Sequence, residues 1–482
     1  MTRHSRRAFL QAAGAAAAAA TLPKFARADV NSQIRMATVG FNGRGKEHIE
    51  GFNKQLVALC DCDSNVLGKT AEAFDKKYGR KLDQISDFRK LLDRKDIDAI
   101  SIATPNHTHS LIAILAVQAG KDVYVEKPIS HGVWEGRQLV NAADRYQRIV
   151  QCGTQSRSQP AIQQAVEYVH SGKLGKILYV IGTCYKPRQP IGKLDKPLVI
   201  PKEVDYDLWC GPAAKVDLYR PRLHYDWHWD YNTGNGDMGN QGIHQMDIAR
   251  WFLGEKTISP RVISFGGRLG YSDAGNTANT QVVLHDYPTA PLIFETRGLP
   301  KSKEAQKNWG GSMDEYRGSR VGVIVQCEHG MALSTSDYET THIFGPDGDE
   351  ITTFHGGGEH LHFDNFLQAV RSRKRGDLNA DVVEGHLSSA LCHTGGISHV
   401  LGQPQPADDI LKSVAANERL QDSLERMFAH LRANDVDIDK PVVTAGAELV
   451  MDPATERFTN NSPANDLLRR EDRRPFEVPE IA

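Results

Sequence analysis

The sequence lacks two features that would assign it to large functional classes, a long apolar run and an excess of basic residues. No stretch of eighteen apolar residues is present, so the sequence offers no hydrophobic membrane-spanning helix. Residues 1–28 hold five basic and no acidic side chains, and the remaining chain has 53 basic against 60 acidic ones, a formal charge of −7. Because a nucleic-acid-binding surface needs a basic stripe, this balance argues against nucleic acid as a partner.

Cysteine is also scarce, and its seven positions follow no regular spacing. Cys60 and Cys62 are too close in an extended chain for an easy disulfide, so we expect buried or partly buried thiols. The nineteen histidines contain no catalytic zinc pattern such as H-E-x-x-H, and no metal is predicted. Closely spaced histidines are interpreted as packed or capping residues: His224 with His228, and His360 with His362.

The N-terminus carries a pattern typical of a twin-arginine export signal. Arg6 and Arg7 precede an alanine-rich run at 12–20, and a small-x-small triplet ends at Ala28. The alternative, an amphipathic first helix, lacks an apolar stripe larger than alanine that could pack on a core. We therefore expect cleavage after Ala28 and a periplasmic or other extracytoplasmic location. Because this route carries folded proteins, a cofactor could be loaded before export.

The chain beyond the signal is too long for one core, which predicts more than one domain. Strand and helix patterns alternate along 34–153, as a parallel sheet with crossover helices requires. From 154 onward several strand patterns occur without long helices between them. We predict an α/β Rossmann domain over 34–153 and an α+β domain with a large open, mainly antiparallel sheet over 154–440. A tail with little periodicity, expected to wrap the surface, follows over 441–482.

A glycine-rich turn follows the first predicted strand. It reads Gly40, Phe41, Asn42, Gly43, Arg44, Gly45. Such a turn lets the backbone approach a pyrophosphate, which then lies at the positive end of the next helix. Asn42 stands where the usual motif has its second glycine, and Gly43 is the candidate to allow that close approach. Asp61 closes the next apolar run and is placed to accept hydrogen bonds from the adenosine ribose. Asp61 and Asp63 would repel a 2′-phosphate, which favours NAD over NADP.

Two polar clusters follow later strands, Thr104 to His109 and Glu126-Lys127-Pro128. Because the carboxyl ends of parallel strands face the ligand crevice, both should project toward the nicotinamide half of the cofactor. Together with the glycine turn and the segment Gly236 to Asp247, they resemble the Gfo/Idh/MocA family of glucose–fructose oxidoreductase and inositol dehydrogenase. The resemblance covers nearly the whole chain after residue 28.

This resemblance implies an NAD(P)-dependent oxidoreductase that transfers hydride from a hydroxyl-bearing carbon of a sugar, cyclitol or sugar acid. It places Lys127 beside the nicotinamide and makes His244 the general acid/base, since an imidazole with a pKa near neutrality can take the hydroxyl proton. A surface lysine and a core or capping histidine are the alternative roles. The implied cofactor-binding residues are Gly40, Asn42, Gly43, Arg44, Gly45, Asp61, Thr104, Pro105, Asn106, His109, Glu126 and Lys127.

One position departs from the family pattern, which commonly has aspartate four residues before the histidine. Asn240 stands there and is kept as a candidate catalytic residue. It can hydrogen-bond a substrate hydroxyl or the imidazole, but it cannot raise the imidazole pKa as a carboxylate would. Asp237 and Asp247 are candidates to replace the missing charge. A helix cap or a surface ion pair is the alternative role for each.

A segment rich in aromatic, charged and histidine side chains, 220–231, precedes the predicted active-site helix. Such mixtures recognise carbohydrates, because ring faces stack on C–H surfaces while polar groups meet hydroxyls. A surface loop fixed by aromatic packing is the alternative. The expected substrate-binding residues are Tyr185, Arg188, Trp227 and Asp247.

Three functions remain open from the sequence. The first is the oxidoreductase described above. The second is an NAD-dependent glycosidase or lyase, in which a tightly bound and recycled NAD oxidises the sugar transiently; the scarcity of free NAD outside the cytoplasm favours it. The third is a non-catalytic sugar-binding protein, which the presence of both Lys127 and His244 opposes. The open sheet predicts a homo-oligomer.

Overall fold

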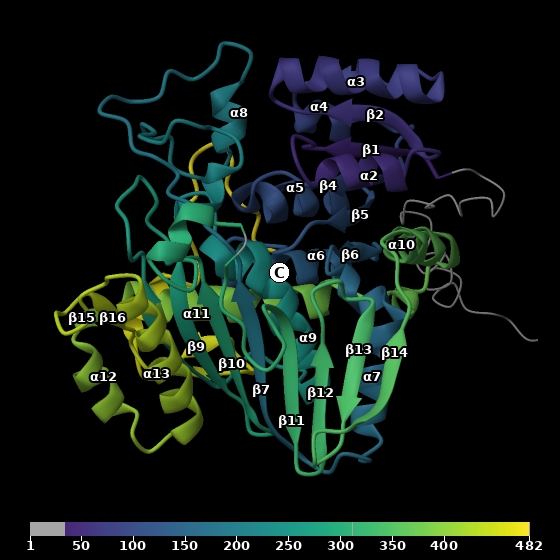
Figure 1. Cartoon of the computed structure of the whole chain (residues 1–482). Helices are drawn as coiled ribbons and strands as arrows, with labels where there is room; N and C mark the ends of the chain where they lie inside the picture. Colours follow the sequence, from purple (N-terminus) through teal and green to yellow (C-terminus); the bar gives the residue numbers. More distant parts are fainter. Residues whose placement is uncertain (1–33, 311, 482) are drawn as a thin grey trace, which may run out of the picture. The chain divides into compact units, whose positions relative to one another are not determined.

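The computed structural model describes residues 34–310 and 312–481, and the predicted export signal at 1–28 lies outside them. Figure 1 shows a smaller sheet that carries the first part of the described chain and a larger sheet formed by the rest. None of the helices in the described segments is long and apolar enough to cross a membrane. All seven cysteines are free thiols, six of them buried.

The smaller sheet has six parallel strands in the order β3-β2-β1-β4-β5-β6. Its central strands read as short apolar runs and are buried along their whole length, as parallel strands covered on both faces must be. The strands are β1 (Met36–Val39), β2 (Leu56–Cys60), β3 (Asp83–Ile85), β4 (Ala99–Ile102), β5 (Asp122–Val125) and β6 (Val150–Cys152). The helices are α2 (Gly45–Gly51), α3 (Ser64–Tyr78), α4 (Phe88–Leu92), α5 (Asn106–Gln118) and α6 (Val133–Tyr146).

The larger sheet has twelve strands, and its main path runs β14-β13-β12-β11-β7-β10-β9-β8-β16-β15. The pairing is antiparallel except between β7 and β10, so the predicted fold class is confirmed. The strands are β7 (Ile177–Tyr185), β8 (Arg261–Gly267), β9 (Thr280–Asp286), β10 (Pro291–Arg297), β11 (Val321–Cys327), β12 (Gly330–Ser334), β13 (Thr340–Phe344), β14 (Glu350–His355), β15 (Gln403–Gln405), β16 (Val443–Ala445), β17 (Leu449–Asp452) and β18 (Arg457–Phe458).

Helices cover both faces of this larger sheet. On one face lie α7 (Pro160–His170), α9 (Ile243–Leu253) and α11 (Val382–Val400), which share a core with β7 to β12. On the other face α12 (Ala407–Ser413) and α13 (Glu418–Ala433) pack over the region of β8, β9 and β10. The chain therefore covers part of the sheet face that was predicted to be open.

Segments from the second half of the chain complete the Rossmann core. Phe363 and Phe366 of α10 (His360–Ser372) pack against Phe52 and Tyr124. The tail forms β16 to β18 and α14 (Ser462–Asp466), and its last apolar side chains, such as Phe476, are buried in the cluster around α4 to α6. The tail thus anchors a few buried side chains in this core, while most of its residues are exposed or partly exposed.

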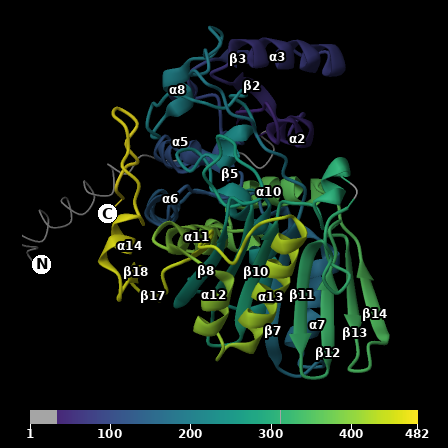
Figure 2. The same ribbon diagram turned by 60° about the vertical axis from the view of Figure 1, so that its left-hand side comes forward.

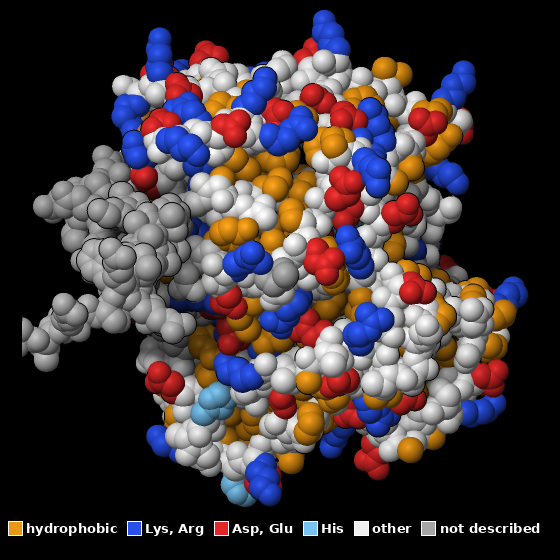
Figure 3. All heavy atoms as spheres, turned by 180° about the vertical axis from the view of Figure 1, so that it is seen from behind, with side chains coloured by type: hydrophobic (Ala, Val, Ile, Leu, Met, Phe, Trp, Pro, Cys, Tyr) orange, Lys and Arg blue, Asp and Glu red, His pale blue; other side chains and the backbone are white. Residues whose placement is uncertain are grey.

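The surface view in Figure 3 shows Lys and Arg side chains interspersed with Asp and Glu on the face that it displays.

Several short helical turns connect the main elements. They are α8 (Tyr206–Cys210), η1 (Gln155–Ser158), η2 (Asp226–Trp229), η3 (Met238–Gly242), η4 (Glu304–Asn308) and η5 (Arg375–Asp377).

Candidate active site

The glycine turn joins β1 to α2 under tight steric limits. Gly40 has a φ of +76°, and a Cβ there would come within 2.9 Å of the Thr104 backbone. A Cβ on Gly45 would overlap the carbonyl oxygen of Gly40. A Cβ on Gly43 would meet nothing within 4 Å, and Asn42 beside it is exposed. Gly40 and Gly45 are thus required by the turn, whereas Asn42 and Gly43 border open space, which suits the close approach of a ligand to the backbone.

A cavity of about 310 Å³ lies on this turn, which is within the roughly 300–1,000 Å³ of most small-molecule sites. Its floor is formed by the carboxyl ends of β1, β2, β4 and β5. Its opposite wall comes from residues that follow the Rossmann strands in sequence, with Trp209, Tyr225 and Trp227 among the side chains. The predicted cofactor-binding residues that line it are Gly40, Asn42, Gly43, Arg44, Asp61, Thr104, Pro105, Asn106, His109, Glu126 and Lys127.

Asp61 lies at the β2 end of the cavity. Its carboxylate accepts hydrogen bonds from the backbone N–H groups of Asp63 (2.9 Å) and Phe41 (3.3 Å). Burial raises the pKa of Asp61 to about 6, because it outweighs these two hydrogen bonds. The carboxylate is therefore fixed in position at the mouth of the glycine turn.

Glu126 lies near the β5 end of the cavity, at the centre of a buried cluster of charged and polar side chains. Its carboxylate accepts from Arg44 Nε (3.0 Å) and from the backbone N–H of Lys127 (3.2 Å), and it lies 3.2 Å from His48 Nε2. Arg44 also pairs with Glu359. Burial alone would raise the pKa of Glu126, but Arg44 and His48 hold it well below its ordinary value. Glu126 is therefore an anion that fixes the glycine turn against the β5 loop.

Lys127 extends from the same loop to the second domain. Its Nζ donates a 2.5 Å hydrogen bond to the backbone carbonyl of Asn240. Burial lowers the pKa of Lys127 below its ordinary value, although Glu126 opposes the shift. Asn240 lies in η3, a π-helical turn that leads directly into α9, and such turns are frequent at functional sites.

His244 is the second residue of α9 and is buried. Its Nδ1 has no hydrogen-bond partner, and its ring lies 5.9 Å from that of Tyr338. Burial and then Lys127 hold the pKa of His244 well below its ordinary value, so the predicted near-neutral pKa is not found. A desolvated imidazole next to an ammonium group stays neutral at physiological pH. The side chain is thus present in the form that accepts a proton.

His109 ties the two polar clusters together. Its ring nitrogens lie 2.7 Å from the carbonyl oxygens of Pro128 and Thr104. The loops after β4 and β5 therefore keep a fixed spacing along the cavity floor.

Of the predicted substrate-binding residues, Trp227 lines the cavity, stacked on His228 at 3.6 Å between ring centroids. The other three have partners elsewhere and do not line it. Tyr185 donates a 2.5 Å hydrogen bond to Glu295 inside the sheet. Arg188 and Asp247 each form a buried ion pair, with Asp237 and Arg157 respectively. Asp247 is consequently not available to support the His244 imidazole.

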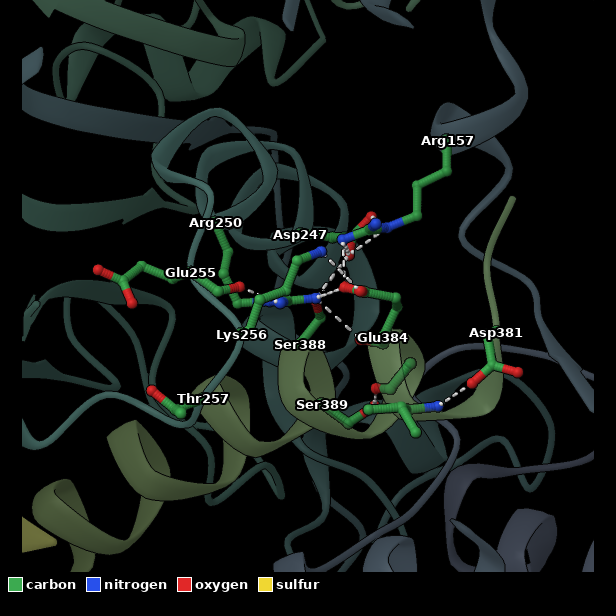
Figure 4. Close-up of polar contacts among 12 residues, drawn as sticks. Arg157, Asp247, Arg250, Glu255, Lys256, Thr257, Asp381, Glu384, Ser388 and Ser389 are labelled. Carbon is green, nitrogen blue, oxygen red and sulfur yellow. Dashed lines mark hydrogen bonds and ion pairs between the residues drawn. The ribbon is translucent and has the colours of Figure 1, made fainter. Parts of the chain in front are cut away.

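Figure 4 shows the buried network that contains Asp247. Arg157 Nε lies 2.9 Å from the Asp247 carboxylate, which also accepts a 2.6 Å hydrogen bond from Ser388 of α11. Arg250 donates to Glu384 at 2.6 Å, and Glu384 lies 3.2 Å from Arg157. Because Arg157 belongs to η1, just after the last Rossmann strand, the network joins that domain to the helix that carries His244.

Replacing Arg157 with methionine is expected to lower the free energy of unfolding by about 3–5 kcal/mol, because the variant removes the nearest cation of the buried Asp247 and leaves Arg250 at 3.8 Å. Denaturant unfolding measures the change. Lys256→Met is the matched control, since Lys256 reaches the same network through Glu384 (2.9 Å) but is exposed; it should cost at most about 1 kcal/mol. Equal losses in the two variants would contradict this account.

The wall opposite the glycine turn belongs to a segment that we call the strap, residues 201–231. The backbone N–H of Asp205 donates to the Cys62 carbonyl (2.9 Å), and that of Ser64 donates to Glu203 (3.0 Å). His224 Nε2 lies 3.0 Å from the Asp63 carboxylate. The strap is therefore attached to the loop that carries Asp61. From the sequence, the aromatic residues of the strap were expected to bind a sugar. Their position opposite the glycine turn and the attachment of the strap to the loop after β2 were not predicted.

The remaining histidine pairs hold no metal ligand set. His362 lies 2.8 Å from the Cys152 carbonyl and 2.6 Å from Ser158 Oγ, in a packed position. Within residues 34–310 and 312–481, no group of three or more His, Cys, Asp or Glu side chains is arranged to hold a metal ion.

Comparison with known proteins adds to this geometry. A family model described as an oxidoreductase family with an NAD-binding Rossmann fold matches residues 34–154, and the model of that family's C-terminal alpha/beta domain matches 167–294. Levoglucosan dehydrogenase from Pseudarthrobacter phenanthrenivorans is 28% identical over 259 residues, which is 50% of this chain and 59% of that protein. Inositol 2-dehydrogenase 4 from Saccharopolyspora erythraea is 23% identical over 385 residues, 78% of this chain and 96% of that protein. A solved levoglucosan dehydrogenase in complex with NADH and levoglucosan superposes with a TM-score of 0.57 at 17% identity, covering 75% of this chain and 95% of that one, which shows the shared fold.

Proposed function

Because the chain belongs to the Gfo/Idh/MocA family of oxidoreductases, we propose that it transfers hydride between a nicotinamide cofactor and a hydroxyl-bearing carbon of a carbohydrate-like substrate. The family confirms the predicted enzyme class, an NAD(P)-dependent oxidoreductase. One observation carries the rest of the proposal: a single cavity joins the glycine turn and Asp61 at one end to Lys127 and Asn240 at the other.

The residues present fit a dinucleotide. Gly43 borders open space, so the backbone of the turn can be approached closely, and Asp61 is fixed where ribose hydroxyls can donate to it. NAD, when bound, supplies the hydride acceptor. Lys127 stabilises the developing oxyanion of the substrate, and the neutral His244 accepts the hydroxyl proton. Asn240 holds the Lys127 ammonium group through its carbonyl oxygen.

The carboxylate of Asp61 favours NAD over NADP, because it would repel a 2′-phosphate. Replacing Asp61 with serine is expected to weaken NAD binding by about tenfold or more, through the loss of charge-assisted hydrogen bonds, and to improve NADP binding relative to NAD. Calorimetric titration with both cofactors measures the ratio. Asp75→Ser, on the far end of α3, is the control. An unchanged NAD to NADP ratio would contradict the assignment.

A second candidate is the NAD-dependent glycosidase or lyase, and the strap favours it. Trp209, His224 and Trp227 line the cavity, and hydrogen bonds attach the strap to the β2 loop beside Asp61, where they would slow the release of a bound cofactor. Slow release would suit a cofactor that is oxidised and reduced again within one turnover.

One experiment separates these candidates. The protein is purified without added nucleotide and denatured, and the supernatant is assayed for NAD(H) and NADP(H). Near-stoichiometric NAD supports the retained-cofactor enzyme, and glycosides become the next substrates to test. An empty protein that binds added NAD supports the exchangeable dehydrogenase. A protein that neither carries nor binds dinucleotide contradicts both and leaves the sugar-binding protein.

Location and assembly complete the proposal. The paired arginines and the alanine-rich run support export by the twin-arginine route, which a fusion of residues 1–28 to a folded reporter would test.

The sheet face formed by strands β11 to β14 supports a homo-oligomer, because α12 and α13 leave it uncovered. Its size is measured by light scattering.

A further inference from the structure

Two lysine ammonium groups meet at one turn of the candidate active site. Lys127 Nζ donates to the carbonyl oxygen of Asn240 at 2.5 Å, and Lys186 Nζ donates to Oε1 of Gln241 at 3.1 Å. Asn240 and Gln241 are neighbours in η3, directly before His244. Lys127 is partly buried, whereas Lys186, the first residue after β7, is exposed. Lys186 is therefore the more accessible of the two. It does not line the cavity as Lys127 does, but its partner Gln241 adjoins Asn240, which does.

The carboxylates around this turn already have other partners. Glu126 is held by Arg44 and His48, and Asp237 accepts three contacts of 2.6–3.0 Å from Arg188. In the part of the chain that the structure describes, Lys127 and Lys186 form no ion pair with a carboxylate. Asn240 itself has an uncharged side chain. Both ammonium groups therefore lack a carboxylate in ion-pair contact, although Glu126 lies close enough to Lys127 to act on its pKa.

The position of Gln241, the hydrogen-bond partner of Lys186, is fixed by further hydrogen bonds. Nε2 of Gln241 donates to the hydroxyl of Tyr338 (2.8 Å), which also accepts from Gln245 (2.7 Å). Tyr338 has a φ of +59°, a conformation that is costly for a bulky residue and persists only where its surroundings hold it. The β12–β13 hairpin thus holds Tyr338 against α9, and Tyr338 in turn directs the Gln241 oxygen at Lys186.

We propose that Lys186 binds a carboxylate of the substrate, so that the preferred substrates are sugar acids rather than neutral sugars or cyclitols. This inference rests on the proposed oxidoreductase function. An ammonium group with only a neutral amide oxygen as partner gains a charge-assisted hydrogen bond when a carboxylate arrives. Lys127 adds attraction from the reacting side of the substrate. Its own hydrogen bond to Asn240 keeps it at the reacting hydroxyl.

The test compares the wild type with Lys186→Gln on matched substrates: D-gluconate and D-glucuronate against D-glucose and myo-inositol. The variant is expected to lose about 10- to 100-fold in kcat/KM for the acids, mainly through KM, with no change for the neutral compounds. Lys186→Arg should retain the preference, and Lys69→Gln, an exposed lysine on α3, should behave as the wild type. Rising salt should lower kcat/KM for the acids alone.

Two results would overturn the inference while leaving the oxidoreductase intact: neutral sugars oxidised as efficiently as the acids, or equal losses on both classes in Lys186→Gln. If no compound is oxidised, the carboxylate site is tested by calorimetry of D-gluconate binding to the NAD-loaded protein. Binding that is lost in Lys186→Gln supports the carboxylate site although the proposed reaction fails, and binding unaffected by the substitution contradicts it.

Discussion

Replacing Lys127 with methionine is expected to lower kcat by about 10²- to 10⁴-fold while the protein remains folded and binds NAD. Methionine keeps most of the side-chain length but removes the ammonium group. The developing oxyanion then has no cation beside it, and the Asn240 carbonyl loses its 2.5 Å donor. The loss should appear in kcat, because the interaction strengthens as the charge develops.

Lys69→Met provides the control for this variant, since it removes an exposed lysine of α3 that lies away from the cavity. NAD binding by calorimetry separates chemistry from cofactor loss. Normal turnover in Lys127→Met would remove Lys127 from the mechanism. A variant that fails to bind NAD would instead assign it to the cofactor site.

The second large effect is expected at His244. Replacing it with alanine should lower kcat by about 10²- to 10⁴-fold, because the variant lacks the imidazole that takes the hydroxyl proton. Added imidazole should restore part of the activity. His342→Ala, on β13, is the control.

The pH profile gives an independent test of the same residue. Because the pKa of His244 is lowered, its neutral form persists below the ordinary imidazole range near pH 6.5. Alcohol oxidation by the wild type should therefore hold its rate to well below pH 6.5 and fall only as pH drops through the lowered pKa. An acid limb at or above pH 6.5, or one that survives in His244→Ala, would contradict the role of His244 as base.

The Rossmann domain and the cofactor end of the cavity could be predicted because they depend on residues that are close together in sequence. Gly40 and Gly45 follow from the geometry of one turn, and Asp61 and Lys127 follow strands whose ends must share an edge. In the larger sheet, the parallel pairing of β7 with β10 joins strands that are distant in sequence, and no local pattern indicates it.

The substrate side could be predicted less well, because the partners of buried charges are distant in sequence. Tyr185 binds Glu295, 110 residues away, and Asp247 binds Arg157, 90 residues away. Helical spacing predicts Asp247 near His244, but its carboxylate binds Arg157 and Ser388 of α11 instead. The imidazole pKa depends on burial, which a sequence pattern does not measure.

The most direct test of the central claim is a single-turnover experiment on the NAD-loaded protein. Nicotinamide absorbance is followed after adding a panel of sugars, cyclitols and sugar acids to the wild type and to Lys127→Met. The account predicts reduction of bound NAD by at least one compound in the wild type and at least about a hundredfold slower reduction in the variant. NAD that binds but is reduced by no compound, or equally fast by both proteins, would contradict it.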